Sequence, residues 1–255
     1  MKTETWTQAV RHRLDLGRLL PLGGPYDGTW ITERAAARVL ELAAAEVPGV
    51  RLESLRIGSA PLEPVSEPTV RPPAGALPPG PLRIEAACTV PLGKPLPETT
   101  DQLRSALLNA AAERLGLATV TADLRVTDLQ DVPETGVKSR TTARAMRPAP
   151  ETATARSSPA MTGTGSMRGP VRELADVVTG VPGVARLTSA LGSRPVKVED
   201  HDDPPGRRIE VQLAVARGHH PLEVARAVRT AVTDAATTDK SGPVTAAVLI
   251  TETAA

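Results

Sequence analysis

Two short groups of polar residues have the chemistry to bind a metal ion or to transfer a proton. Asp200-His201-Asp202-Asp203 combines carboxylates with an imidazole, and both are metal ligands in proteins. Side chains of adjacent residues in a turn diverge, so this segment is predicted to be a solvated acidic hairpin loop and not a metal site. The pair His219-His220 follows Gly218 in a predicted strand-to-helix turn, where exposed histidines are expected to form polar surface.

Cys88 is the only cysteine, and its environment decides whether it is a nucleophile. Ile84, Ala86, Cys88 and Val90 occupy alternate positions, which places Cys88 on the inward face of a predicted strand. A catalytic thiol needs exposure and a nearby base, so we interpret Cys88 as a small core residue. One cysteine cannot form an internal disulfide. This usage fits a reducing compartment, and a cytoplasmic location is expected.

Three segments partly match phosphate-binding motifs. Gly163–Gly169 is one residue away from GxGxxG and has no preceding strand, and Lys138-Ser139 lacks the glycine that precedes lysine in a P-loop. Gly180-Val181-Pro182-Gly183 fits the GxxG of KH domains, but it contains no basic residue and recurs as Glu46-Val47-Pro48-Gly49. We therefore predict no catalytic residue, no cofactor, no metal and no small-molecule substrate, and hence a protein that is not an enzyme.

The composition limits which partners the chain attracts by charge and which residue types can form its core. The 255 residues include 30 basic and 29 acidic side chains, and the net charge of +1 gives no overall attraction to nucleic acid or anionic lipid. Phe is absent and aromatic residues make up 1% of the chain, so thin cores of Val, Leu, Ile and Ala are expected. The charged first 20 residues predict no signal peptide, and without a run of about 18 apolar residues no transmembrane segment is expected.

The elements that must position these residues occur twice in the sequence. Val47-Pro48-Gly49-Val50 closes a helical pattern in the first half, and Val181-Pro182-Gly183-Val184 closes another in the second. Four further pairs of segments follow in the same order: 82–86 with 208–211, 93–96 with 218–222, 103–107 with 228–232, and 120–127 with 244–251. Five matched segments in one order indicate an internal duplication.

Apolar spacing predicts the secondary structure of each copy. Residues 36–47 and 171–178 have the i, i+3, i+4 spacing of an amphipathic helix, with Thr32 as the N-cap of the first. In Val-Pro-Gly-Val, proline and glycine suit the two central positions of a type II turn. Residues 84–90 and 209–215 alternate like half-buried strands. Val196 and Val198 suggest an additional strand in the second copy.

The predicted fold class is α+β, with two tandem small α-β-β-α-β sandwich modules joined by a disordered linker. In each module, helices cover one face of a sheet. The boundaries are 1–30 for an N-terminal amphipathic arm, 31–130 for the first module with a proline-rich loop at 59–81, 131–168 for the linker, and 169–255 for the second module.

The arm contains the candidate protein-binding residues. Trp6, Val10 and Leu14 form an apolar stripe at helical spacing. Two interpretations stay open: the stripe docks into a groove of a partner protein, or it covers the first module of its own chain. A sheet with helices on one face also leaves an open face or edge, and such surfaces bind other chains. The sequence therefore predicts self-association or protein binding.

These motifs resemble the alkaline-shock-protein family of Gram-positive bacteria, also called envelope stress response proteins. The resemblance rests on Ile31-Thr32 before a helix, the Ala-rich helix that ends at Val47-Pro48-Gly49-Val50, the Ile-Glu strand, the Gly-x-x-Pro-Leu segment and the final strand. It covers most of both halves. The duplication and the Trp6 arm look like an actinobacterial tandem-module branch, whose members are sometimes labelled as a nucleopolyhedrovirus p-ten family.

The resemblance implies a non-enzymatic cytoplasmic scaffold or adaptor of the envelope stress response. The implied partners are further copies of the chain in a homo-oligomer, a related envelope stress protein, and a small anchor protein that holds it at the membrane. Family members are usually one acidic module, whereas this chain is neutral and duplicated. The alternative is a nucleic-acid-binding protein with KH-like modules, which requires lysine and arginine side chains to cluster on one face.

The composition of the predicted linker determines where a protease should cut first. Residues 131–168 contain almost no large apolar side chains, so burial cannot offset the entropy lost on ordering them. Limited proteolysis followed by mass spectrometry is expected to cleave between residues 131 and 168 before it cleaves elsewhere. Protection of this segment, with early cleavage inside 31–130 or 169–255, would contradict the prediction.

Overall fold

The computed structural model describes residues 16–60, 68–131, 169–191, 194–202, 205–239 and 242–254. In this part of the chain the fold is α+β, as predicted, with the strands in two sheets. Trp6, Val10 and Leu14 of the predicted arm lie outside the described residues, as do residues 132–168 of the predicted linker.

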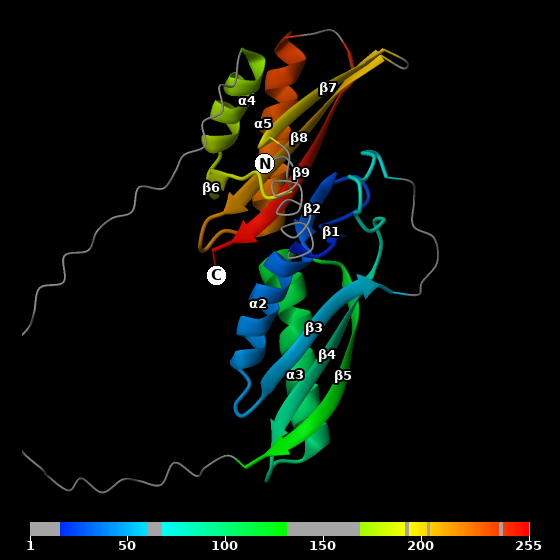
Figure 1. The fold of residues 1–255 in the computed structure, drawn as a ribbon, viewed down its shortest axis with the longest axis vertical. Coiled ribbons are helices and arrows are strands. Elements are labelled where there is room, and N and C mark those ends of the chain that lie inside the picture. The colour runs from blue at the N-terminus through cyan, green and yellow to red at the C-terminus, as the bar shows by residue number, and fades with distance from the viewer. Residues whose placement is uncertain are drawn as a thin grey trace, which may run out of the picture.

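Figure 1 shows the two sheets one above the other, each with a pair of helices beside it, and with β1 and β2, which belong to the upper sheet, on its side toward the lower one. In chain order the elements are β1 Leu19–Pro21, β2 Thr29–Thr32, α2 Glu33–Ala45, β3 Arg51–Ser59, β4 Leu82–Pro91, α3 Leu96–Asn109, the π-helical turn η1 Ala110–Leu115, β5 Thr119–Gln130, α4 Pro170–Thr179, β6 Val184–Leu187, β7 Val196–Asp202, β8 Pro205–Val215, α5 Pro221–Asp239 and β9 Val244–Thr253.

The three-stranded sheet has the order β3-β4-β5 and belongs to the first half of the chain. Strand β3 runs antiparallel to β4, and β5 runs parallel to β4 after the crossover through α3. Helix α2 starts where the sequence predicts, because the Thr32 side chain accepts a hydrogen bond from the Ala35 amide at 3.3 Å. Its apolar stripe, including Ala36 and Leu40, is buried against the sheet.

The turn after each first helix is also as predicted. The amide of Val50 donates to the carbonyl of Val47 at 3.3 Å, and the amide of Val184 donates to the carbonyl of Val181 at 3.2 Å. Gly49 and Gly183 have φ angles of 79° and 90°, which only glycine adopts at low cost. Both Val-Pro-Gly-Val segments therefore form hydrogen-bonded turns that lead the chain from a helix into a strand.

The six-stranded sheet has the order β1-β2-β9-β8-β6, and β7 also pairs with β8. Strand β8 is antiparallel to β6 and β7 and parallel to β9. Strands β6 and β7 pair with different ends of β8, so together they hold the place that β3 holds beside β4. Strands β4 and β8 thus occupy equivalent central positions.

The N-terminal segment differs from the sequence prediction. The sequence predicts an arm over residues 1–30, but β1 and half of β2 lie within this range and are strands of the second half's sheet. Strand β2 runs parallel to β9, with Trp30 opposite Leu249 and Ile31 opposite Ile250. The periodic pattern did not reveal β2, because both faces of this short strand are buried and its residues do not alternate.

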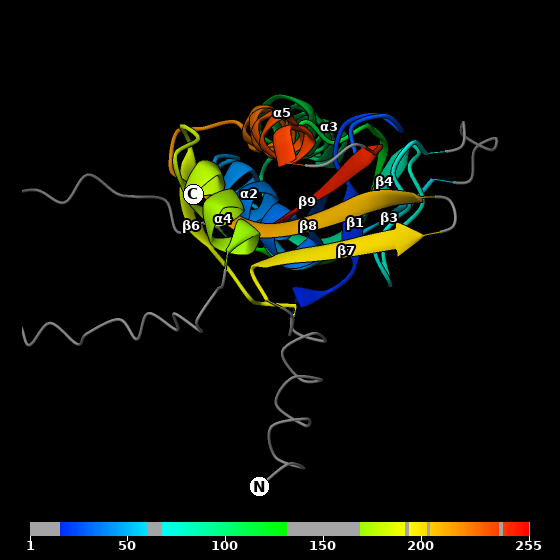
Figure 2. The same ribbon diagram turned by 90° about the horizontal axis from the view of Figure 1, so that it is seen from above.

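Figure 2, seen from above, shows α4 and α5 on one side of β8 and β9. Ile31, Val248 and Ile250 face the main core with these helices. Trp30 and Leu249 belong to a second, smaller cluster with Leu19, Val70 and Ala247. The sequence predicted a cover on one face of each sheet, and this is wrong here, because Val70 and Ala76 of the proline-rich segment, together with Leu191, pack with Trp30 and Leu249 on the other face.

The helices in the described ranges include none that is both long and apolar enough to span a lipid bilayer.

A carboxylate fastens the β1–β2 turn to the second half. Asp27 accepts two hydrogen bonds from the guanidinium of Arg226 on α5, at 2.8 and 2.9 Å, and one from the amide of Gly24 at 2.7 Å. The bonds from Arg226 hold the pKa of Asp27 below its usual range, although partial burial acts in the opposite direction. The charged form of Asp27 therefore stabilises the attachment of the N-terminal strands.

The Asp27 clamp predicts acid sensitivity. Because its pKa is lower in the folded than in the unfolded chain, its stabilising effect is present above about pH 4 and is lost as pH falls through the folded-state pKa. Asp27→Asn is expected to lower the free energy of unfolding at pH 7 by about 1–2 kcal/mol and to flatten its dependence on acid pH. Urea unfolding from pH 7 to pH 3 measures both effects.

The control is Asp176→Asn, at an exposed position of α4, which should leave stability nearly unchanged. If Asp27→Asn has the same urea midpoint as wild type at every pH, the clamp contributes nothing to folding.

Candidate functional site

Cys88 lies where the sequence places it, on the inward face of β4, and it is fully buried. Burial raises the pKa of its thiol, and the negative charge of Glu53 adds to this effect. A buried thiol with a raised pKa stays protonated and is a poor nucleophile. Its position supports the interpretation of Cys88 as a core residue.

The acidic segment near residue 200 is more ordered than predicted. Asp200 and His201 belong to β7, which forms a hairpin with β8, so the loop is shorter than the sequence suggests. Asp200 accepts a hydrogen bond from Arg207 at 2.8 Å. Asp203 lies outside the described residues. Where the structure describes the chain, it brings together no group of three metal-binding side chains.

His219 and His220 line a cleft of about 680 Å³ between α2, η1 and the loop before α5. Both histidines pack against glycines of other elements. A Cβ added at Gly183 would lie 2.8 Å from His219 Nδ1, and one added at Gly116 would lie 2.9 Å from His220 Cε1. The pair therefore has a packing role between elements in addition to the predicted surface role.

An ion pair spans the same cleft. Glu46, the C-cap of α2, accepts hydrogen bonds from Arg114 of η1 at 2.8 and 2.9 Å, which lowers the pKa of the glutamate and raises that of the arginine. These two charges satisfy each other, and the exposed Leu42 lies beside them. The cleft thus combines this ion pair and the two histidines with apolar side chains.

A groove of about 810 Å³ lies on the outer face of the six-stranded sheet, beside the proline-rich residues 71–75. Along β7 and β8 its charges alternate in sign, and Lys197 pairs with Glu199 at 2.6 Å. The ionisable residues that line the groove are Arg71, Lys197, Glu199, His201, Arg208 and Glu210. Because acids lie among the bases, the groove offers no continuous positive track for a phosphate backbone.

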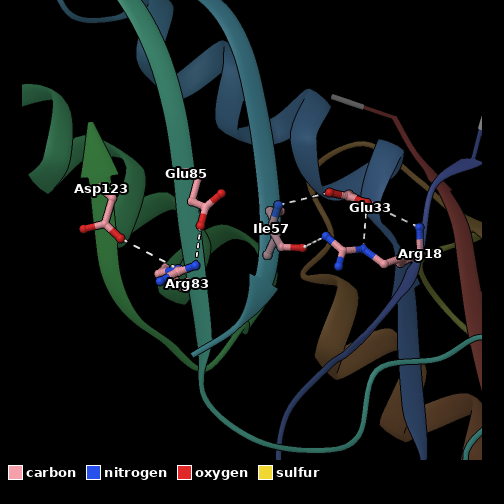
Figure 3. A network of polar contacts seen from close by, with 6 residues as sticks. All are labelled: Arg18, Glu33, Ile57, Arg83, Glu85 and Asp123. Atoms are coloured by element: carbon pink, nitrogen blue, oxygen red, sulfur yellow. Dashed lines mark hydrogen bonds and ion pairs between the residues drawn. The ribbon is translucent and has the colours of Figure 1, made fainter. Parts of the chain in front are cut away.

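The outer face of the three-stranded sheet is polar and faces away from α2 and α3. Figure 3 shows Arg83 of β4 between Glu85 and Asp123 of β5, with 3.8 Å between the charged atoms of Arg83 and Asp123. The strand register and the exposure pattern place eight charged residues on this face: Arg51, Glu53, Arg56, Arg83, Glu85, Asp123, Arg125 and Asp128. Four are basic and four acidic, so arginines do not cluster apart from acids here.

The β3 edge of this sheet is closed by side chains. Figure 3 shows Glu33 and Arg18 beside Ile57: the Ile57 amide donates to Glu33 at 3.0 Å, and the Ile57 carbonyl accepts from Arg18 at 2.8 Å. Arg18 and Glu33 also form an ion pair at 3.5 Å. A bulge between Leu52 and Ser54 interrupts the same strand. These are features that keep a strand edge from pairing with another chain.

On the opposite side of the same sheet, the free edge of β5 has no strand partner among the described residues. Strand β5 has 12 residues, and it pairs with β4 alone among the described strands. Besides the ladder with β4, its backbone bonds to two side chains in the described residues: Arg104 donates to the Ala122 carbonyl at 3.2 Å, and the Leu129 amide donates to Asp128 at 2.8 Å. Register shifts against β4 lie at Thr119/Thr121 and Val126/Asp128, so the regular stretch of β5 is residues 121–126. Val120 and Leu129, near its two ends, are 48% and 43% exposed. We identify the β5 edge as the candidate interaction site of the described chain.

The sequence did not single out this edge. The predicted residues Trp6, Val10 and Leu14 lie outside the described part of the chain, and their interaction role stays a prediction. The signal available in the sequence is the alternation of charges in Asp123-Leu124-Arg125, within a segment that reads as a final strand.

No protein-family model, curated protein or solved structure matches this chain.

The closed β3 edge predicts the effect of removing its cover. Glu33→Ala leaves the buried Ile57 amide without its partner and frees Arg18, so the free energy of unfolding is expected to fall by about 2 kcal/mol. The exposed edge should also increase aggregation, measured by light scattering during incubation at 37 °C. Glu41→Ala, at an exposed position of the same helix, is the matched control. Equal stability and equal aggregation of the two variants would show that Glu33 does not protect the edge.

Proposed function

We propose that this chain is a non-enzymatic scaffold or adaptor, which acts by self-association and protein binding. The observation that carries the proposal is the contrast between the two edges of one sheet. Arg18 and Glu33 cover both backbone groups of Ile57 on the β3 edge, whereas in the regular stretch of β5, residues 121–126, the Ala122 carbonyl is the backbone group that a described side chain covers. An exposed regular strand is a ready template for pairing with a further strand.

The second half of the chain supports this use of the edge. In our proposal the two halves are tandem modules that arose by duplication, and β5 and β9 are equivalent last strands. Strand β9 does not lie at an edge, because β2 pairs with it in parallel. A module of this type thus accepts a strand beside its last strand, and the corresponding place beside β5 is vacant among the described residues.

The resemblance to envelope stress response proteins suggests the biological setting. We place the protein in the cytoplasm, with further copies of itself or a related envelope stress protein as partners, and with a small membrane anchor protein as an additional partner. Trp6, Val10 and Leu14 provide a second contact, since an apolar helical stripe binds in grooves of partner proteins.

The alternative, a KH-like nucleic-acid-binding protein, has less support. It requires a face on which basic side chains exceed acidic ones. On the outer face of the three-stranded sheet the four arginines alternate with four acids, and the groove beside β7 and β8 is likewise mixed. Protein binding is therefore the better interpretation.

The proposed function predicts association of the purified chain. Light scattering after size-exclusion chromatography should show a mass that rises above the monomer mass with concentration. Trp6→Ala/Leu14→Ala should weaken association about tenfold, because it removes two apolar contacts worth roughly 1 kcal/mol or more together. Gln8→Ala/His12→Ala changes the opposite side of the arm and is the matched control.

A chain that is monomeric at every concentration and captures no protein in pull-downs would contradict the scaffold function. Salt-sensitive binding to RNA or single-stranded DNA in the micromolar range would favour the KH-like alternative.

A further inference from the structure

We propose that two copies of this chain join edge to edge through β5, antiparallel and centred on Leu124, so that Asp123 of each copy faces Arg125 of the other. This inference rests on the self-association proposed above and identifies its surface. The two three-stranded sheets would form one continuous sheet, with the helices of both copies on one side and the charged faces on the other.

The direction of the backbone groups on β5 supports pairing at this edge. The Ala122 carbonyl accepts a hydrogen bond from Arg104, a side chain outside the sheet, so this carbonyl points away from β4. Residues two apart on a strand point the same way, hence Leu124 and Val126 also present their backbone groups at the free edge. The Arg104 side chain is 42% exposed, and an incoming amide can replace it at the Ala122 carbonyl.

The same alternation places Asp123 and Arg125 at the positions where side chains of the two paired β5 strands would come closest. When Leu124 faces its own copy in an antiparallel ladder, its neighbours occupy positions without mutual hydrogen bonds, where opposite Cα atoms are about 4.5 Å apart. Side chains at such opposite positions lie on the same face of the sheet. Asp123 and Arg125 then form two equivalent ion pairs across the two-fold axis.

The charges on β5 favour a second copy as the occupant. Arg125 is exposed and makes no ion pair with any described residue, and Asp123 is held only loosely, at 3.8 Å from Arg83. A strand with an acid and a base two residues apart is complementary to itself in antiparallel pairing. Parallel pairing in register would instead set Asp123 against Asp123 and Arg125 against Arg125, which is unfavourable. The β3 edge is a poorer place for pairing, because Glu33, whose side chain is 15% exposed, bonds the Ile57 amide and Arg18 bonds the Ile57 carbonyl.

The test reverses these two charges singly, together and in a mixture of chains. Asp123→Arg alone and Arg125→Asp alone each set like charges against each other twice, so each is expected to weaken the dimer by about 10- to 100-fold in sedimentation velocity. The double variant Asp123→Arg/Arg125→Asp restores opposite charges and should recover wild-type affinity. An equimolar mixture of the two single variants should form a heterodimer, because one chain then contributes two arginines and the other two aspartates.

Arg56→Asp is the matched control, since it reverses a charge on the same face of β3, two strands away from the edge, and should leave dimerisation unchanged. Thermal unfolding of each variant at dilute concentration separates loss of pairing from loss of folding, and the mixture provides the same check within one sample.

Each result has a distinct meaning. If the wild-type chain associates but the single variants associate equally well, β5 pairing is overturned while the proposed scaffold function stands. If the single variants weaken association but neither the mixture nor the double variant restores it, the antiparallel register is overturned. If the wild-type chain is monomeric at all concentrations, both the pairing and the proposed self-association fall.

Discussion

The parallel pairing of β2 with β9 is the contact on which the arrangement of the two halves depends. It places Trp30 and Ile31 on opposite faces of the six-stranded sheet, so a strand of four residues contributes to both apolar clusters. The residue that ends this strand, Thr32, also caps α2 and donates its hydroxyl to the Thr251 carbonyl at 3.1 Å. The first helix of one half therefore begins on the sheet of the other, and one main core extends through both.

The pairing of β2 with β9 determines which strand edges stay unpaired. In the six-stranded sheet one edge is β1, with three residues, and the opposite side is divided between β6 and β7. Short and interrupted edges pair poorly with other chains. Among the described strands none pairs with the free side of β5, and the β3 edge of the same sheet is covered at Ile57 by Arg18 and Glu33. The strand edges of the described chain are thus unequal, and β5 presents a regular stretch, residues 121–126, between two register shifts.

Local patterns in the sequence predicted the parts of the fold that depend on neighbouring residues. The cap at Thr32, the Val-Pro-Gly-Val turns and the inward position of Cys88 follow from spacing within a few residues, and the structure confirms them. The strand β2 could not be found in this way, because its partner is about 220 residues away and both of its faces are buried. The closure of the β3 edge was missed for the same reason, since Glu33 and Ile57 are joined by folding and not by periodicity. For the β5 edge the charges were visible, but their exposure was not.

The separation between β2 and β9 also has a consequence for biosynthesis. Residues 29–31 leave the ribosome long before residues 248–250 exist, so Trp30 cannot reach Ala247 and Leu249 until the last strand has been made. Contacts at such sequence separation form slowly, because loop closure must precede the gain from packing. A nascent chain therefore carries the apolar surface of Leu19 and Trp30 until β9 has been made. A chain that stops before β9 leaves β2 without the strand it pairs with, and the apolar side chains of its N-terminal strands then stay exposed.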